Sequence, residues 1–519
     1  MSTAARLISG TTASWMRMGI IMISQIALVP LYLNFWSVET YGVWLAIQAL
    51  ITIITMIDLG HQTYLGYEFL RLANTNKNEL SRNLWSGVVA GCCIGMFQIV
   101  LILIFIYTDT LPGFLGIANL QDQSLVTAGS IALLLQGVAW LIATSISGLF
   151  VRALEPFGYY PRLAWWGVFC ELVKNIAPAV AVVLGADLLI TGVVLATVTV
   201  AMNIPIYFDM FRLMRKIQIR FCRPSIKLAY TNFFRSTAVV GKLILENARQ
   251  QGVRLVLAPF SGAAALAAFS TMRTASNVAL QGLNTITNPL MPDLMKFLHG
   301  RDQVRSEAAF GTVWVVVVAM MAPAVVILQV FISPLFDLWT QGQIHFDPTL
   351  FAILSLTVLI YAVTQPAMAV VMGNNLMAPQ LVLSGLAAIV VIGGILVLVP
   401  SIGIAAAGVA LLCGEIVSSI GYTIIAKKWL AKNNLIWPTK SFVIAITSVV
   451  VAAISMSCMI LFPEAKWIIF AVSQLLFALN FWRYWLVLPS VVTHKVLSLA
   501  GRLPGMKKVF QSERLESIK

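Results

Sequence analysis

Long apolar segments follow one another along the whole chain, and they limit the fold more than any other feature of the sequence. We place about fourteen of them, each about twenty residues long, which is enough for a helix to cross a hydrocarbon core about 30 Å thick. Helices satisfy all their backbone hydrogen bonds internally, as lipid requires. The chain is 59% hydrophobic and 10% charged, whereas soluble domains carry about 25% charged residues. The sequence therefore predicts an all-α polytopic membrane protein.

The loops between these segments alternate between basic and nearly uncharged. The predicted spans are 12–33, 40–58, 84–107, 125–149, 163–184, 188–211, 236–258, 262–290, 308–332, 350–373, 380–399, 404–426, 440–462 and 466–488. Basic residues such as Arg212, Arg215 and Lys216 follow the even-numbered spans except the tenth, whose loop GNNLMAPQ has none, whereas Lys466 is the lone lysine or arginine of the opposite loops. The positive-inside rule then places both termini in the cytoplasm. The net charge of +14 is spread over these loops, which indicates membrane orientation and not a nucleic-acid-binding face.

Sequence features typical of enzymes are missing. The chain has no phosphate-binding P-loop, and its histidines and cysteines show no metal-ligand spacing. No loop exceeds about 30 residues, which is too short for an independent soluble domain. We expect no enzymatic activity, no cofactor and no metal.

The two halves of the chain resemble each other. Three pairs of helix-end residues are separated by the same interval: Pro161 and Pro379, Gly167 and Gly385, and Gly185 and Gly403. Both halves begin with an odd-numbered span, so they form a parallel repeat around an axis along the membrane normal. We predict two six-helix lobes, 1–235 and 236–430, followed by two further helices and a cytoplasmic tail in 431–519. Transporters built this way bind substrate where the repeats meet.

The seventh span carries an unusual number of polar side chains. Lys242, Glu246, Arg249, Gln250 and Arg254 fall on an arc of about 140° of one helix. Charges inside a membrane are costly, so this stripe must face protein or water. It could bind a ligand, or Glu246 could neutralise Lys242 or Arg249 in an internal ion pair. Lys242 and Arg254 could also extend to the membrane interfaces.

Arginines of two neighbouring helices are predicted to meet at one depth. Arg249 lies roughly 15 Å from the turn that joins the seventh and eighth spans, and Arg273 descends to a similar level in the eighth. A guanidinium stays charged when buried and binds phosphate oxygens with two hydrogen bonds. The pair could therefore hold a diphosphate.

Other charges inside the predicted spans allow two interpretations each. Arg17 could line a cavity or extend to the cytoplasmic surface, and Glu171 is expected to pair with Lys174 at helical spacing. Glu415 could carry a proton or Na⁺, or be a protonated structural group. Asp58 is expected at a membrane interface.

Positive charge dominates inside the predicted spans. Three acidic residues, Glu171, Glu246 and Glu415, oppose a larger basic set: Arg17, Lys174, Lys242, Arg249, Arg254 and Arg273. A cavity lined by this set would be net positive, so the expected substrate is an anion.

The segment PLYLNFWSVETYGVWLAIQALITIITMIDLG carries a family resemblance. Its Tyr41-Gly42 pair, its Asp58-Leu59-Gly60 end and the later FGYYPR resemble the polysaccharide-transporter branch of the multidrug/oligosaccharidyl-lipid/polysaccharide exporter superfamily. The resemblance implies a bacterial inner-membrane flippase that moves undecaprenyl-diphosphate-linked oligosaccharide by alternating access, with Arg17, Arg249 and Arg273 lining its cavity. It also implies coupling to H⁺ or Na⁺, and as partners the lipid-linked glycan, membrane lipids and other polysaccharide-assembly proteins.

Two other functions remain open from the sequence. The drug-exporting branch of the same superfamily often uses a carboxylate in its first helix, but the first predicted span here has Arg17 and Gln25 and no carboxylate. A membrane glycosyltransferase or O-antigen polymerase would need catalytic groups in its external loops. The longest of these, SPLFDLWTQGQIHFDP, has only Asp337 and Asp347 as carboxylates.

Overall fold

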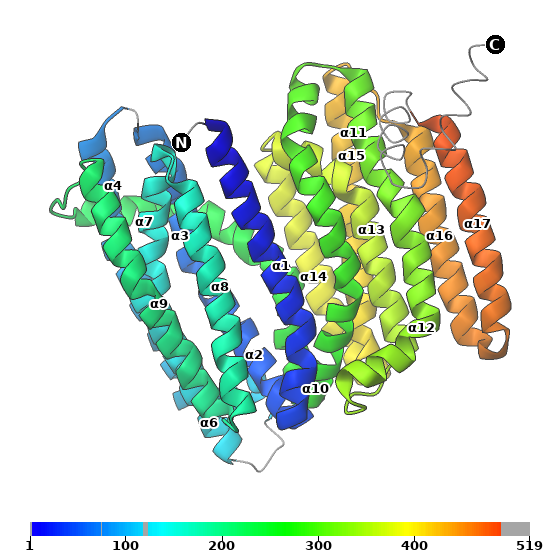
Figure 1. Ribbon diagram of the computed structural model, residues 1–519, viewed down its shortest axis with the longest axis horizontal. Helices are drawn as coiled ribbons and strands as arrows, with labels where there is room; N and C mark the ends of the chain where they lie inside the picture. The colour runs from blue at the N-terminus through cyan, green and yellow to red at the C-terminus, as the bar shows by residue number, and fades with distance from the viewer. Residues whose placement is uncertain (1–2, 74, 118–122, 489–519) are drawn as a thin grey trace. The chain divides into compact units, whose positions relative to one another are not determined.

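The computed structural model describes residues 3–73, 75–117 and 123–488, and these residues form helices and no strands (Figure 1). Of the described helices, 12 are long and apolar enough to cross a membrane, or up to 13 if a bent pair counts as one span. The predicted all-α polytopic fold is confirmed. The total of about fourteen spans stays a prediction.

Packing divides the chain into two compact units, each assembled from separated segments. The first unit is Met1–Ala275, Leu335–Phe346 and Ser384–Gly414, and the second is Ser276–Pro334, Asp347–Leu383 and Glu415–Lys519. Each unit is a group of segments that pack more closely with one another than with the rest of the chain. The lobe boundaries proposed from the repeat stay a prediction.

In chain order, the helices as far as His299 are α1 (Thr3–Phe35), α2 (Val38–Ile54), α3 (Met56–Leu72), α4 (Lys77–Tyr107), α5 (Leu111–Leu115), α6 (Gln123–Ala139), η1 (Trp140–Ser145), α7 (Ile146–Leu154), η2 (Glu155–Phe157), α8 (Tyr160–Val183), α9 (Leu188–Lys216) and α10 (Ile226–His299). The remainder are α11 (Gln303–Val316), η3 (Val317–Met321), α12 (Ala322–Thr340), α13 (Pro348–Gly373), α14 (Met377–Ile402), α15 (Ala405–Lys432), α16 (Thr439–Leu461), η4 (Pro463–Ala465) and α17 (Lys466–Val487).

Side-chain caps fix where several of these helices begin. Each capping oxygen accepts a hydrogen bond from a backbone N–H of the first turn, which would otherwise lack a partner. The caps are Ser37 for α2, Asn76 for α4, Asp187 for α9, Asp302 for α11 and Asp347 for α13. These short polar residues terminate the apolar runs of the sequence, which is why the predicted spans lie close to the observed helices.

The helices contain three irregular positions, and the apolar pattern predicted only the last of them. The helices α2 and α3 meet at Thr55 with a bend of 41°, inside the segment 40–58 that the sequence predicts as one uninterrupted span. A π-helical segment, η1, interrupts the predicted fourth span between α6 and α7. Gly262 breaks α10 with a φ of 84°, at the predicted turn between the seventh and eighth spans.

Two glycines of the sequence resemblance allow helices of the first unit to touch. A Cβ on Gly42 would lie 2.0 Å from the carbonyl oxygen of Ala263, and a Cβ on Gly60 would lie 2.7 Å from the Cα of Val240. Both α2 and α3 therefore pack against the backbone of α10. The Tyr41-Gly42 and Asp58-Leu59-Gly60 motifs thus have a packing role.

In the second unit, an aromatic cluster joins α11, α13 and α16. Trp314 is fully buried and donates a hydrogen bond from Nε1 to the carbonyl oxygen of Val363 at 2.8 Å. Its ring also contacts Trp437 and Phe442. The tail-side helix α17 is attached by Tyr484, whose hydroxyl donates to the carbonyl oxygen of Gly311 at 2.9 Å.

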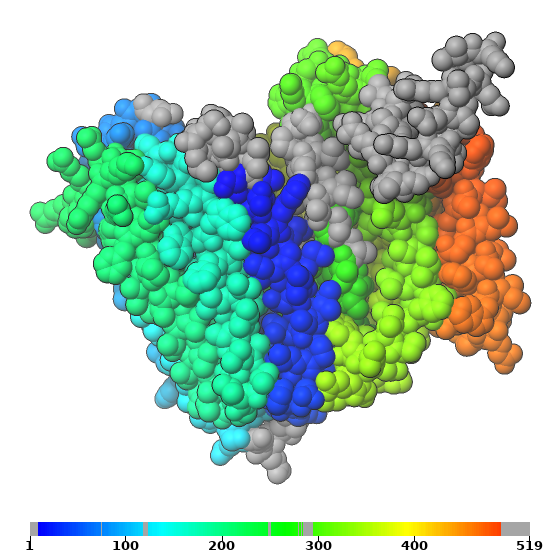
Figure 2. All heavy atoms as spheres, viewed as in Figure 1, coloured from blue at the N-terminus to red at the C-terminus, as the bar shows by residue number. Residues whose placement is uncertain are grey.

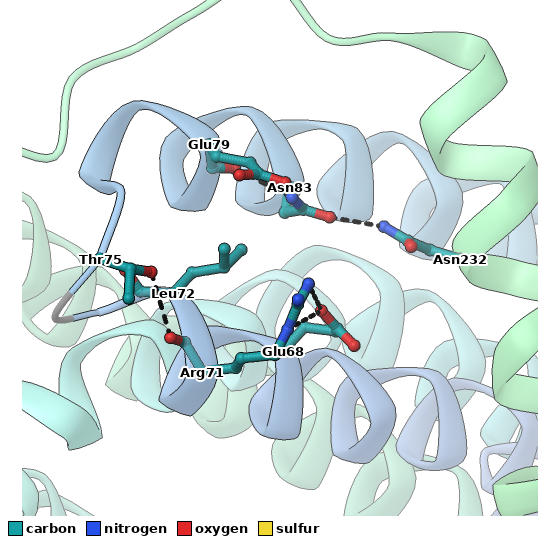
Figure 3. A network of polar contacts seen from close by, with 7 residues as sticks. All are labelled: Glu68, Arg71, Leu72, Thr75, Glu79, Asn83 and Asn232. Atoms are coloured by element: carbon teal, nitrogen blue, oxygen red, sulfur yellow. Dashed lines mark hydrogen bonds and ion pairs between the residues drawn. The ribbon is translucent and has the colours of Figure 1, made fainter.

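A buried amide pair connects α4 to the first part of α10 (Figure 3). Asn232 Nδ2 donates to Asn83 Oδ1 at 2.9 Å, and the two residues are 2% and 5% exposed. Nearby, Arg71 and Glu68 form an exposed ion pair, and exposed pairs contribute little to stability. The amide pair is one of the contacts that hold the start of α10 to this unit.

Asn83→Ala is expected to destabilise the protein by about 1–3 kcal/mol, because the buried Asn232 amide loses its acceptor. The measurement is thermal unfolding of the purified protein in detergent. Replacing both asparagines by alanine removes donor and acceptor together, so the double variant is expected to lose less than the sum of the two single variants. Additive losses would contradict this assignment.

Candidate functional site

The first predicted site residue, Arg17, lies where α1 packs along α8, a contact visible on the face shown in Figure 2. Arg17 donates to Glu171 Oε2 from Nε at 3.3 Å and from Nη2 at 3.2 Å. Its side chain is 55% exposed. The predicted pairing of Glu171 with Lys174 is wrong, since the ion pair of Glu171 is with Arg17 on another helix.

Lys174 nevertheless belongs to the same cluster, because Glu171 and Arg17 both act on it electrostatically. Asn175 adds a hydrogen bond to the carbonyl oxygen of Glu171 at 2.8 Å. One carboxylate therefore faces two cations, so the cluster carries net positive charge. Such a group inside a predicted span suits an anionic ligand.

Lys242 and Glu246 form an ion pair one turn apart on α10, with Nζ 3.7 Å from Oε1. The sequence allowed Glu246 to neutralise either Lys242 or Arg249, and in the structure it pairs with Lys242. The side chain of Arg249 lies outside the described residues, so its predicted role stays a prediction.

Arg254 is the most unusual cation of this set. Nε is buried without a hydrogen-bond partner among the described residues, and Nη1 donates to Gln251 Oε1 at 3.3 Å. Tyr41 of α2 is the titratable neighbour that acts on the guanidinium, and no carboxylate among the described residues pairs with it. A buried guanidinium without a carboxylate is costly, so a bound anion would stabilise it.

Arg273 lies on α10 beyond the Gly262 break, in the same unit as Arg254. Its guanidinium stacks over the ring of Phe269 at 6.0 Å, a favourable cation–π geometry. Tyr41 interacts with both Arg254 and Thr271, and Thr271 is two residues from Arg273. The break therefore folds the two halves of α10 so that both contribute to the surroundings of Tyr41.

Aromatic rings support Tyr41 from the other side. It stacks on Tyr32 with ring centroids 6.0 Å apart, and Tyr32 stacks on Trp36 at 5.0 Å. Trp36 donates from Nε1 to the carbonyl oxygen of Ala186 at 3.1 Å. These contacts hold the hydroxyl of Tyr41 in place beside Arg254.

Glu415, the other predicted coupling candidate, is 5% exposed in α15. A carboxyl at this depth can serve as a proton or cation site or as a structural group. Both interpretations made from the sequence stay open.

The sequence interpretation missed a buried polar cluster around Asp58 in the first unit. Asp58 is 0% exposed, and its Oδ2 accepts hydrogen bonds from Gln62 Nε2 and Trp140 Nε1, both at 2.9 Å. The expectation that Asp58 lies at a membrane interface stays a prediction. Its spacing to Gln62, one turn further along the same helix, was the local signal that could have revealed this cluster.

The π-helical segment η1 supplies the other half of the cluster. It carries Trp140 and Ser145, and both Ser145 Oγ and Asp58 Oδ1 are buried without a hydrogen-bond partner. Tyr207 of α9 donates its hydroxyl hydrogen to the freed carbonyl oxygens of Ile142 and Ala143, at 2.8 and 2.7 Å. Single π-turns of this kind often mark functional positions.

No protein-family model matches the chain, and no curated protein matches it. Among solved structures, the lipid II flippase MurJ in an inward closed conformation superposes with a TM-score of 0.66 at 12% identity, over 92% of this chain and 99% of that one. An inward-facing multidrug resistance MATE family transporter of the MOP superfamily gives 0.65 at 12% identity, over 80% and 95%. The Vibrio cholerae MATE transporter VcmN in the bent form gives 0.53 at 15% identity, over 83% and 98%.

These similarities establish the fold of the chain. The chain shares the multi-pass helical fold of the lipid II flippase MurJ and of the MATE transporters, the fold that the sequence resemblance implies.

Proposed function

We propose that this transporter-fold protein moves undecaprenyl-diphosphate-linked oligosaccharide, a unit of O-antigen, capsule or exopolysaccharide, across the bacterial inner membrane by alternating access, with both termini in the cytoplasm. The observation that carries the proposal is Arg254, a buried guanidinium with no carboxylate partner among the described residues. A diphosphate supplies the missing negative charge and accepts bidentate hydrogen bonds.

The remaining predicted cations extend this role. Arg273 and Arg249 are assigned to the same diphosphate, and the excess charge of the Arg17 cluster attracts the anionic head group toward the protein. Lys242 is assigned a lesser role, because Glu246 already neutralises it. Lipid-linked glycan and membrane lipids are the partners of this activity, together with other polysaccharide-assembly proteins.

The likeness to the lipid II flippase MurJ supports this assignment, since that protein is a flippase for a lipid. The fold and its neighbours also fit a transporter better than an enzyme such as a glycosyltransferase or polymerase.

A cation-coupled multidrug exporter is the second candidate, favoured by the likeness to MATE transporters. The charges argue against it. The described part of α1 contains no carboxylate, and its Arg17 is engaged by Glu171. A set of cations opposes cationic drugs through like-charge repulsion.

Expression of the chain in a strain that lacks its own flippase distinguishes the two functions. We expect restored surface polysaccharide and unchanged drug resistance. Increased drug resistance without surface polysaccharide would establish the exporter instead. In the same assay, Arg249→Ala and Arg273→Ala are expected to abolish display while the protein remains in the membrane.

A further inference from the structure

The Asp58 cluster contains an unsatisfied carboxyl oxygen next to an unsatisfied hydroxyl. A Cβ on Gly91 would lie 3.6 Å from Asp58 Oδ1 and 3.1 Å from Ser145 Oγ, so the two oxygens share the space in front of this glycine. Both atoms are buried and neither meets hydrogen-bond geometry with a partner, although Ser145 lies close enough to act on Asp58 as a donor. Ordinary structural carboxylates in proteins have their oxygens satisfied, so this arrangement requires another explanation.

We propose that Asp58 is a proton-binding site, in which Oδ1 gains and releases a proton against Ser145 Oγ. A hydroxyl can both donate and accept. When Asp58 is ionised, Ser145 donates to Oδ1. When a proton from water binds to Oδ1, the new O–H group donates to Ser145 Oγ, and release returns that proton to water. Both protonation states are thus satisfied by the same pair of groups.

The other groups around Asp58 favour a proton over a metal cation. Gln62 and Trp140 present N–H donors to Oδ2, and a cation would have to displace them. Nearby carbonyl oxygens are engaged, that of Ile54 by Gln98, those of Ile142 and Ala143 by Tyr207, and that of Ser145 by Gln62. Among the described residues, no group of three or more acidic, histidine or cysteine side chains could hold a metal.

Titratable and charged groups approach the site from several elements. They are His61 on α3 itself, Cys92 on α4, Arg152 on α7, Glu155 on η2 and Tyr207 on α9. Arg152 lies close enough to act on Asp58 through space, but its charge is shared with Glu155. Because no residue in the described part of the chain forms an ion pair with Asp58, its charge can change without breaking one.

The position of the site gives proton binding a structural effect. Asp58 follows the 41° bend at Thr55 by three residues and bonds to Trp140 at the first position of η1. Two irregular helix segments therefore meet at this carboxyl. That proton binding drives transport rests on the proposed function, whereas proton binding itself does not.

Infrared difference spectroscopy of the purified full chain in lipid nanodiscs, recorded between high and low pH in H₂O and D₂O, tests the site directly. We expect a deuteration-sensitive carbonyl band from a buried protonated carboxyl that is lost in Asp58→Asn. It is kept in Asp209→Asn, the matched control, because Asp209 also accepts from a tryptophan indole but is ion-paired with Arg162. Persistence of the band in Asp58→Asn would overturn the proposal.

A second variant keeps the test valid if Asp58→Asn does not fold. Ser145→Ala retains the carboxyl and removes its proton partner, so the band is expected to shift in frequency, and an unchanged band would overturn the proposal. Replacing choline chloride by sodium chloride at constant pH is expected to leave the band unchanged. Loss of the band in sodium would show a Na⁺ site and also overturn it.

The coupling of proton binding to transport is measured separately, as the acceleration of lipid-linked glycan translocation by a pH gradient across the proteoliposome membrane. The acceleration is expected to vanish in Asp58→Asn, with translocation at equal pH retained. An Asp58→Asn variant that keeps the wild-type response would refute coupling and leave the proposed function intact. No translocation by any variant would refute the proposed function and leave the infrared result standing.

Discussion

Arg254→Ala is expected to abolish surface polysaccharide in a complemented strain while leaving the protein in the membrane. The guanidinium is the buried cation for which the described residues offer no carboxylate, so the diphosphate would be its main partner. Loss of one side of a buried charge pair costs about 2–5 kcal/mol, which corresponds to more than a tenfold loss in transport. The measurement is antibody or lectin labelling of whole cells, with membrane protein quantified in parallel.

Arg254→Lys separates charge from geometry. Lysine keeps a point charge but lacks the planar fork of arginine, so partial display is expected. Arg305→Ala is the control, because Arg305 is a surface arginine with a 66% exposed side chain paired with Asp302, and it should display normally. Full display by Arg254→Ala would contradict the assigned role of this residue.

Gly42→Ala is expected to produce the largest loss of stability among single methyl additions. The new Cβ would lie 2.0 Å from the carbonyl oxygen and 2.4 Å from the carbonyl carbon of Ala263, and backbone atoms cannot rotate away. The helices α2 and α10 must separate, at a cost of about 1–3 kcal/mol or more. The measurement is the thermal unfolding midpoint in detergent together with the steady-state level in membranes.

Gly19→Ala provides the matched helical control, since no atom lies within 4 Å of its added Cβ. Alanine is a better helix former by up to about 1 kcal/mol, so this variant is expected to be as stable as the wild type or more so. Equal stability of Gly42→Ala and the wild type would show that α2 and α10 do not pack as described.

The helices were predictable because their signals are local. Apolar runs and their short polar caps lie in consecutive residues, and Gly262 marks the turn inside α10 where a positive φ is required. The bend at Thr55 and the π-turn at 140–145 were not predictable, because no proline or glycine lies at those positions. They depend on contacts between distant segments, such as Gln98 with the carbonyl oxygen of Ile54.

The contacts of the candidate site divide in the same way, into local ones that the sequence can suggest and distant ones that it cannot. Lys242 and Glu246 pair at helical spacing, which periodicity alone can suggest. Glu171 has a lysine three residues away, yet it pairs with Arg17, 154 residues earlier in the chain, because α1 packs along α8. Asp58 was assigned to an interface because it ended an apolar run, whereas its partner Trp140 comes from a segment 82 residues away.

The most direct measurement is translocation by the purified protein in proteoliposomes that contain a fluorescent polyprenyl-diphosphate-linked glycan, with quenching by an impermeant reductant as the readout. We expect wild-type protein to expose label from the inner leaflet, and Arg254→Ala to do so at no more than about a tenth of that rate. Equal rates for the two proteins, or no exposure by the wild type above protein-free vesicles, would contradict the claim that buried guanidinium groups carry a lipid diphosphate across the membrane.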